Sequence, residues 1–333
     1  MAQIYEVMRI TGIIFFGIMI TCCDPNTCRQ APKSKQQKKI NIRRMDIEII
    51  KASGPSEILS IMQSDMIIPI DFLDANPENL EETAIQFYEL FKHPSIDTLV
   101  KEAHEAYDSN ENFNENINTL FTNLSYYYPE INMPKIITLI SGLHKDLLIT
   151  KEVIVIGLDF FIGQNASFKP IDIPEYIRER YTQHHIVPIL ALVYANRLLV
   201  RGRQNTLLSE MINHGKLNYM ASQLLPCVPD SLILGYTAQN MVDIQSNREI
   251  IWANFIENEL LYETSEYVKN KFIGERPVIH EISKKCPGRI GGWIGYEIVK
   301  EYMESSNISL QELMKLSDNH EIFIKSGYKP LNN

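Results

Sequence analysis

The sequence predicts a mostly helical α+β domain in which a small β-sheet is followed by a buried central helix. Residues 151–159 are rich in β-branched side chains, which is typical of a strand. Residues 186–199 are apolar on nearly every side, as expected for a helix that is buried all round. Much of the remaining chain repeats apolar residues at helical spacing. Residues 151–200 are therefore the expected spine of the fold.

Composition limits the classes of function that the chain can have. It has 333 residues, of which 45% are hydrophobic, enough to bury a sizeable core. A formal charge of −9 argues against nucleic-acid binding, which requires a basic surface. Beyond the N-terminus no segment reaches the roughly 20 unbroken apolar residues that a membrane span needs. We therefore expect a folded domain outside the bilayer, with no nucleic acid among its partners.

The first residues have the pattern of a secretion signal. Residues 10–20 form an apolar run that is too short to cross a bilayer and has the length of a signal-peptide core. Arg9 lies before this run, and a start at Met8 would place the charge directly ahead of the core. Whether translation starts at Met1 or Met8 stays open.

Two cysteines follow the apolar run, a position that resembles the lipobox at which bacterial lipoproteins are cleaved and acylated. Ile20 and Thr21 best fit the positions before Cys23, so Cys23 is favoured over Cys22 as the acylated residue. Each buried methylene group contributes about 0.8 kcal/mol, so two or three acyl chains would hold the protein on a membrane. The alternative is a secreted soluble protein with incidental cysteines.

Three segments follow from these patterns. Residues 1–23 are the predicted lipoprotein signal peptide. Residues 24–44 are rich in Lys, Gln, Pro and Asn and are predicted to be a flexible tether. Residues 45–330 are predicted to form a single domain, with a helical part at 45–133 and a sheet with further helices at 134–330.

Local signals place the elements of that domain. Apolar residues at helical spacing predict helices over 79–91, 96–107 and 113–127. Residues 135–141 and 147–158 are β-rich, with Gly142 in the turn between them, and predict a sheet of about three strands. Pro188 suits the first turn of a helix, so regular helix is expected from about Val187, with His184 and His185 ahead of it.

The C-terminal part is predicted to be helical. Helices are expected over 206–223, 250–262 and 287–303, and Ser309 with Glu312 fits a capping box for a short final helix. Ile256, on the helix expected over 250–262, is one of the apolar residues predicted to lie in the core.

The helix at 287–303 contains four glycines, each of which costs roughly 1 kcal/mol relative to alanine. Close approach of a neighbouring element at the glycine face is the simplest account of this cost. The functional alternative is an anion or partner site formed by Arg289 and the N-terminal amides of the helix.

The remaining cysteines leave two possibilities open. Five cysteines are too few and too unevenly placed for a disulfide framework. Cys22, Cys23 and Cys28 crowd the N-terminus. Cys227 and Cys286 could pair with each other in an oxidising compartment, or stay separate as two small buried residues.

Several segments together resemble the gliding-motility lipoprotein GldB family. They are 154–159 (IVIGLD), 186–188 (IVP), 234–237 (LGYT), 256–261 (IENELL) and, most specifically, 287–303 (PGRIGGWIGYEIVKEYM). The resemblance implies an envelope lipoprotein of diderm bacteria that is associated with gliding and the linked protein-export machinery. It also implies a scaffold similar to that of predicted zinc peptidases, which carry an HExxH motif on the helix after the sheet.

That motif is degenerate in this chain. A zinc peptidase needs two histidines four residues apart, a glutamate beside the first as general base, and a third ligand downstream. If His185 is the first ligand, the base position holds Ile186 and the second ligand position holds Ile189. Catalysis by this mechanism is therefore not expected.

A remnant non-catalytic metal site remains an alternative. The downstream ligand position holds His214, with Glu210 one turn before it. His185, Glu210 and His214 are therefore the candidate residues of such a site. The primary prediction is a zinc-peptidase-like scaffold without its metal and without any cofactor.

The predicted function is non-enzymatic: a membrane-anchored envelope lipoprotein that supports gliding or the linked secretion machinery. Its expected partners are the membrane, through the N-terminal acyl chains, and envelope proteins of that apparatus. The expected location is the periplasmic side of the envelope, at the outer rather than the inner membrane. The alternatives are a zinc-dependent hydrolase and a ligand-binding lipoprotein that uses the remnant cleft.

Overall fold

Four short strands form a mixed sheet in the computed structural model, which describes residues 28–29, 38–110 and 112–330. The strands are β1 (Ile42–Arg44), β2 (Lys135–Leu139), β3 (Leu147–Ile149) and β4 (Val153–Gly157), in the spatial order β1-β2-β4-β3. β1, β2 and β4 are parallel, and β3 is antiparallel to β4. The α+β fold with a small sheet is therefore confirmed. The candidate lipidation residues Cys22 and Cys23 lie outside the described residues.

The first strand corrects the predicted start of the folded domain. Ile42 pairs with Ile136 of β2, so residues 42–44 belong to the sheet and not to a tether. The chain is already held before this strand, because the Ile40 amide donates to Asn118 at 2.8 Å. A three-residue strand with two arginines has no periodic pattern, and its partner lies more than 90 residues away. No local signal therefore identified it.

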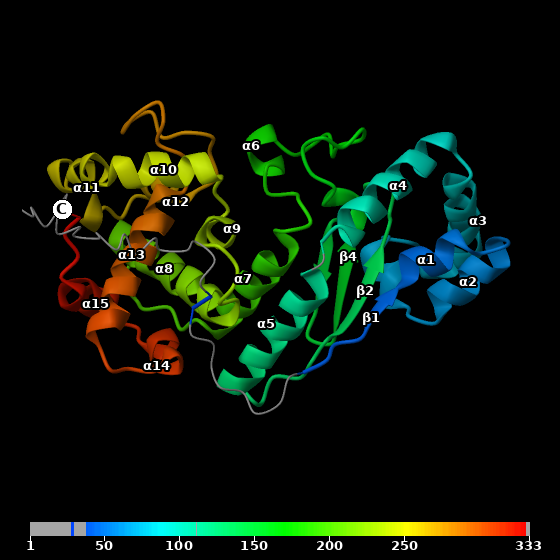
Figure 1. Cartoon of the computed structure of the whole chain (residues 1–333), viewed down its shortest axis with the longest axis horizontal. Helices are drawn as coiled ribbons and strands as arrows, with labels where there is room; N and C mark the ends of the chain where they lie inside the picture. Colours follow the sequence, from blue (N-terminus) through cyan, green and yellow to red (C-terminus); the bar gives the residue numbers. More distant parts are fainter. Residues whose placement is uncertain (1–27, 30–37, 111, 331–333) are drawn as a thin grey trace, which may run out of the picture.

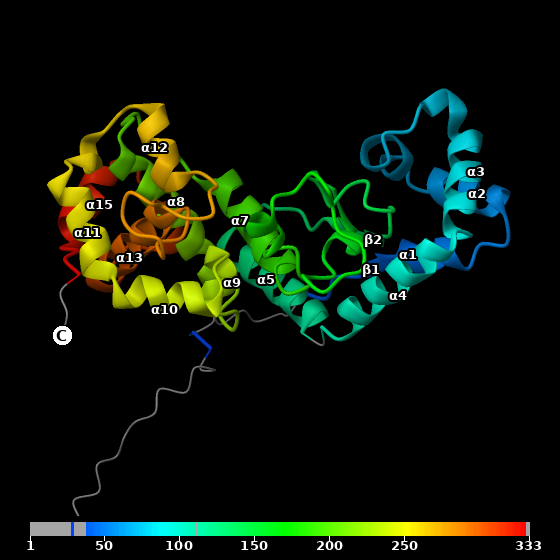
Figure 2. The same cartoon turned by 90° about the horizontal axis from the view of Figure 1, so that it is seen from above.

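The sheet separates two hydrophobic cores. Ile137, Leu139 and Val155 face the smaller core, which also contains residues of α1 (Met45–Ile50), α2 (Pro55–Gln63), η1 (Ile68–Phe72) and α3 (Leu80–Phe91). Alternate residues of the same strands face the larger core, together with α4 (Pro94–Asp108) and α5 (Phe113–Tyr127). The predicted helical character of residues 45–133 is confirmed, and its helices cover both faces of the sheet (Figure 2).

A second lobe of helices continues the larger core (Figure 1). Its long central helices are α7 (Ile186–Leu198), α8 (Leu207–Leu224) and α13 (Ile290–Ser305). The shorter elements are α6 (Glu175–Arg178), α9 (Asp230–Leu234), α10 (Ala238–Ser246), α11 (Arg248–Glu257), η4 (Leu260–Tyr262), α12 (Glu266–Ile273), α14 (Leu310–Lys315) and α15 (Asn319–Ser326). The capping box of Ser309 and Glu312 is present at the start of α14. None of the helices in the described ranges is long and apolar enough to cross a bilayer.

The glycines of α13 lie against α8, as the close-approach prediction required. A Cβ added at Gly295 would overlap the backbone carbonyl of Met211, and one added at Gly215 would overlap the carbonyl of Gly295. The two backbones therefore meet at a point where no side chain fits. α13 itself begins at Ile290 and not at Pro287, because Arg289 adopts a left-handed conformation with φ 60°.

The helix predicted over 250–262 is interrupted. α11 ends at Glu257, and Glu259 adopts a left-handed conformation with φ 54° before the short η4 turn. Ile256 was predicted to lie in the core, but it is 47% exposed. Helical spacing identifies an apolar side chain on a helix, but it does not show whether a neighbouring element covers it.

Candidate functional site

His185 lies at the N-cap of α7, directly before the first helical residue Ile186, as predicted. Its ring is buried, and Nδ1 lies 2.8 Å from the Thr182 hydroxyl oxygen. Burial and the nearby positive charge of Arg180 lower the pKa of His185 to about 4, so the ring is neutral at pH 7. His184 is exposed and lines a different cavity from His185, so the two histidines do not act as a pair.

The cavity beside His185 has a volume of about 220 Å³. It lies between the edge strand β3, the first turns of α7, and α9. Its wall is largely apolar and includes Pro188, Ile189 and Leu234, while Arg180 and Arg289 supply positive charge. Ile186, at the position of a general base, is buried in the larger core. The two positions that metallopeptidase chemistry would use therefore carry hydrocarbon side chains.

His214 and Glu210 lie on α8, and neither of them lines the His185 cavity. His214 lines an adjoining cavity of about 410 Å³, and burial lowers its pKa. The Glu210 carboxylate lies 3.5 Å from the guanidinium of Arg201. Within residues 28–29, 38–110 and 112–330, no group of three or more His, Cys, Asp or Glu side chains is arranged to hold a metal ion. His185, Glu210 and His214 thus do not form a ligand set.

Arg289 connects the start of α13 to the end of α9. Its two terminal nitrogens donate to the backbone carbonyls of Leu234 at 2.9 Å and Gly235 at 2.7 Å. Its Nε lies 3.5 Å from the Glu275 carboxylate, and the guanidinium lies 5.0 Å from the centre of the Tyr236 ring. These donors already have acceptors within the protein. The arrangement fits a structural latch, while the predicted anion or partner role stays a prediction.

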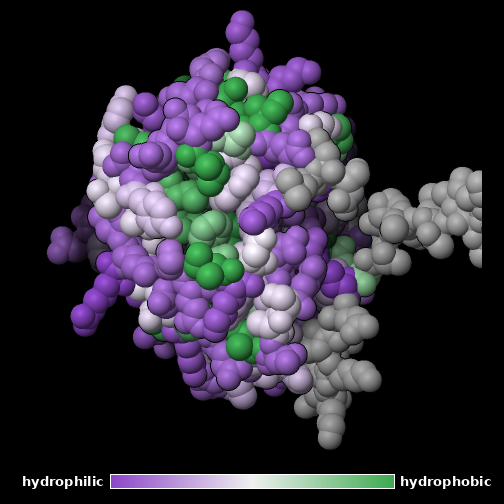
Figure 3. Space-filling view, turned by 90° about the vertical axis from the view of Figure 1, so that its left-hand side faces the viewer, coloured by the Kyte–Doolittle hydropathy of each residue, from purple (hydrophilic) through white to green (hydrophobic). Residues whose placement is uncertain are grey.

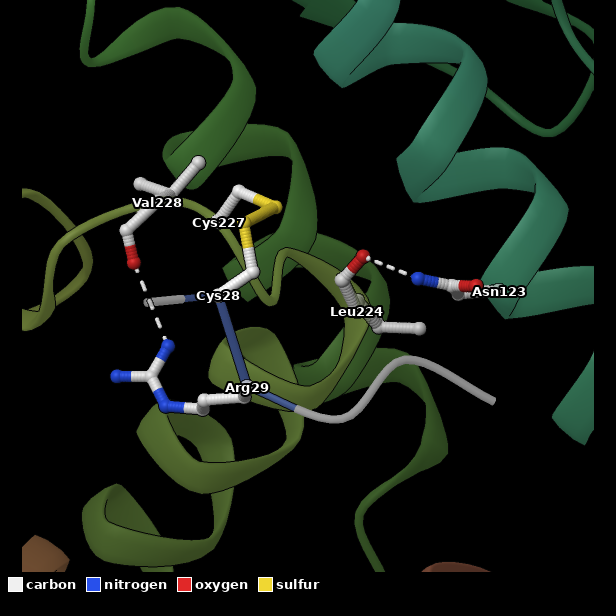
Figure 4. Close-up of a disulfide and its surroundings, with 6 residues drawn as sticks. All are labelled: Cys28, Arg29, Asn123, Leu224, Cys227 and Val228. Atoms are coloured by element: carbon white, nitrogen blue, oxygen red, sulfur yellow. Dashed lines mark hydrogen bonds between the residues drawn. A yellow bond between two sulfur atoms is a disulfide. The ribbon is translucent and has the colours of Figure 1, made fainter. Parts of the chain in front are cut away.

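A disulfide joins Cys28 to Cys227, with the two Cα atoms 4.3 Å apart (Figure 4). Of the two alternatives, pairing of Cys227 with Cys286 is therefore wrong, and a separate buried thiol is right for Cys286 but not for the exposed, bonded Cys227. Cys286 is free and buried, and burial raises the pKa of its thiol to about 12. Cys28 comes from the polar N-terminal segment and Cys227 from a loop 199 residues later. The only signal for this pair in the sequence is the presence of Cys28 and Cys227 in a chain that is predicted to lie in the envelope.

Arg29 strengthens the attachment beside the disulfide. Its amide donates to the Pro226 carbonyl at 3.0 Å, and its guanidinium donates to the Val228 carbonyl at 3.3 Å. The guanidinium also forms an ion pair with Asp230. Cys28 and Arg29 are therefore fixed to the loop between α8 and α9.

Comparison with known proteins agrees with the sequence motifs. No curated protein and no solved structure is significantly similar to the chain. The matched region of the family found runs from residue 27 to residue 330, which includes Cys28, the sheet, the cavities lined by His185 and His214, and the glycine helix. The chain therefore belongs to the lipoprotein family described as gliding motility protein GldB.

Proposed function

We propose that this GldB-family protein is a non-enzymatic envelope lipoprotein that supports gliding, or the linked protein-export machinery, through contacts with other envelope proteins. Family membership supports a gliding-related lipoprotein. We propose in addition that the protein has no catalytic activity, that its partners are envelope proteins, and that it lies on the periplasmic side of the membrane. Each rests on a separate observation.

The observation that carries the proposal is the chemistry of the His185 region. A zinc peptidase places a carboxylate beside its first histidine and a second histidine one turn further on. In this chain those positions hold Ile186, which is buried in the core, and Ile189, which lines the cavity. A hydrocarbon side chain can neither accept a proton nor bind zinc. The scaffold therefore supports packing rather than hydrolysis at this point.

The Cys28–Cys227 disulfide supports an extracytoplasmic location. Structural disulfides persist in oxidising compartments such as the bacterial periplasm and are rare in the cytosol. The proposal puts the domain on the periplasmic side of the envelope, with the outer membrane favoured over the inner. Attachment would be through acyl chains on Cys23, with Cys22 as the alternative.

Contacts with other proteins are supported by exposed apolar side chains at one end of the helical lobe. Val242 on α10, Ile256 on α11 and Ile324 on α15 are all exposed, and we call this group the apolar end face. α11 and α15 are neighbours, because the Trp252 ring lies 6.0 Å from the Phe323 ring. Figure 3 shows apolar side chains gathered over this end of the molecule. Exposed apolar side chains at one end of a molecule are candidates for a protein interface.

Two matched substitutions test this function. Ile256→Glu places a charge on the apolar end face, whereas Ile85→Glu places the same charge on α3, where Ile85 is 50% exposed and lies outside that face. Both should leave stability within about 0.5 kcal/mol of the native protein, because both sites are exposed. We expect Ile256→Glu to lose gliding and to lose the partner recovered by pull-down from envelope fractions. Ile85→Glu should keep both, and equal behaviour of the two variants would contradict the proposal.

The second candidate function is a hydrolase or ligand-binding lipoprotein that uses the cavity beside His185. The cavity combines a largely apolar wall with the charged side chains of Arg180, Arg289 and Asp146, and this combination favours this candidate. Metal analysis of the purified protein separates the two functions. Stoichiometric zinc that survives dialysis, and is lost in the His185→Ala and His214→Ala variants, would support the second function and overturn the first.

A further inference from the structure

We propose that the Cys28–Cys227 disulfide shortens the lipid anchor so strongly that the loop between α8 and α9 is held against the membrane surface. This inference rests on the proposed lipid attachment at Cys23. Beyond lipid attachment, it states which face of the domain is turned towards the bilayer. The surface consists of the exposed disulfide, Pro229 and the polar side chains around Cys227.

The chain between the anchor and the domain is short. Cys23 precedes Cys28 by five residues, and five residues of extended chain span at most about 18 Å. Acylation at Cys22 would add one residue, for a reach of about 22 Å. Without the disulfide and the contacts of Arg29, the next attachment within the described residues is at Lys38, whose amide donates to Thr122 at 2.8 Å. The reach from Cys23 would then be about 54 Å.

The two anchor lengths have to be compared with the width of the domain. A domain of about 300 residues has a radius of gyration near 19 Å, which corresponds to roughly 50 Å across. A 54 Å anchor is about as long as such a domain is wide and would let several faces of the domain meet the membrane. An anchor of about 18 Å is much shorter than the domain is wide, so only the face that carries Cys28 can come close. The described Cys28–Arg29 piece lies on the side of α9 and α10, opposite α12 (Figure 2).

The charge of this face is compatible with lipid headgroups. The chain as a whole carries a formal charge of −9, which anionic headgroups would repel. Around Cys227 the cavity wall instead contains uncharged amides, including Asn110, Asn116 and Gln183, with Glu115 as the acidic residue. The nearby Asp230 carboxylate is neutralised by its ion pair with Arg29. The surface next to the anchor is therefore nearly neutral, and the repelling charge lies elsewhere.

The test uses the full acylated chain, purified from membranes and reconstituted into vesicles with an energy-transfer acceptor on the lipid headgroups. A fluorescent amino acid is placed either at Pro229, next to Cys227, or at Tyr267, which is 74% exposed on α12. Flotation with the vesicles reports lipid attachment independently of orientation. We expect floating protein to show severalfold greater energy transfer from position 229 than from position 267.

Matched insertions distinguish a short anchor from a folding effect. A flexible insert of about twelve Gly and Ser residues between Cys23 and Cys28 lengthens the anchor and leaves the disulfide intact. The same insert between Arg29 and Lys38 leaves the anchor unchanged. The first insert should abolish the difference between the two positions, and the second should preserve it.

The outcomes separate this inference from the proposed function. Floating protein with equal energy transfer from both positions would overturn the inference and leave the lipid anchor standing. Equal effects of the two insertions would also overturn it, because anchor length would then not determine orientation. Protein that fails to float would overturn the lipid anchor and the inference together.

Discussion

Removing the Cys28–Cys227 disulfide should destabilise the whole domain, because the bond closes a very long loop. The two cysteines are 199 residues apart, so the cross-link constrains about 200 residues of the unfolded chain. The loop-closure relation for a loop of that length gives an entropy change of about −18 cal/mol/K. At 25 °C this corresponds to about 5 kcal/mol of stability, against a total of roughly 5–15 kcal/mol for a typical protein.

The perturbation is the double variant Cys28→Ser with Cys227→Ser, which leaves no new free thiol. Urea unfolding can be followed by the fluorescence of Trp293, whose side chain is 1% exposed in the native protein. With an m-value of about 3 kcal/mol/M, a loss of 5 kcal/mol lowers the unfolding midpoint by about 1.7 M. Reduction of the native protein should give the same shift and should have no further effect on the double variant.

A Cys286→Ala variant provides the control for thiol effects, since Cys286 is free and buried. It should respond to reductant as the native protein does. A difference below about 1 kcal/mol between the oxidised protein and the double variant would refute the reasoning, because the unfolded chain would then gain little freedom when the bond is lost.

Three further substitutions test the packing and the buried ionisable groups. Gly295→Ala should lose about 3 kcal/mol, because its Cβ would overlap a carbonyl of α8. Gly54→Ala, at the N-cap of α2 and in open space, should lose no more than about 1 kcal/mol, and equal midpoints in urea would contradict the α8–α13 contact. His185 has a folded-state pKa of about 4, below its ordinary 6.5, so it lowers stability as the pH falls from 6.5 to 4, by about 3 kcal/mol in total. The His185→Asn variant should show a flatter pH dependence in calorimetry, and replacement of the exposed His280 should not. Lys216 is fully buried and donates to the end of α14 and to α15, so Lys216→Met should lower stability by about 3 kcal/mol, and an unchanged melting temperature would count against these bonds.

The elements with strong local signals were predictable from the sequence. The apolar character of α7 all round predicted a buried helix, and Pro188 predicted that the histidines precede it, because a proline fits the first turn. The glycines of α13 predicted a close contact, because only a backbone approach offsets their cost in a helix. The family follows from motifs spread along the chain.

The candidate site was predictable in its chemistry and not in its geometry. Isoleucine at positions 186 and 189 excluded a general base and a second ligand from the sequence alone. That His185 and His214 line separate cavities depends on how α7 and α8 pack against α9 and α13. The spacing of residues on two different helices contains no information about that packing.

The tertiary structure alone decided how the N-terminal segment is attached. Residues 24–44 are polar, and composition predicted a tether, because such a segment cannot bury apolar surface of its own. The structure instead pairs β1 with β2 and Cys28 with Cys227. Patterns of period two or 3.6 report local conformation, whereas a three-residue strand and a single cysteine acquire their partners only when distant parts of the chain are brought together. What the sequence determined by itself is therefore the type of each long element and the chemistry of its residues, and what the fold decided is which distant residues meet.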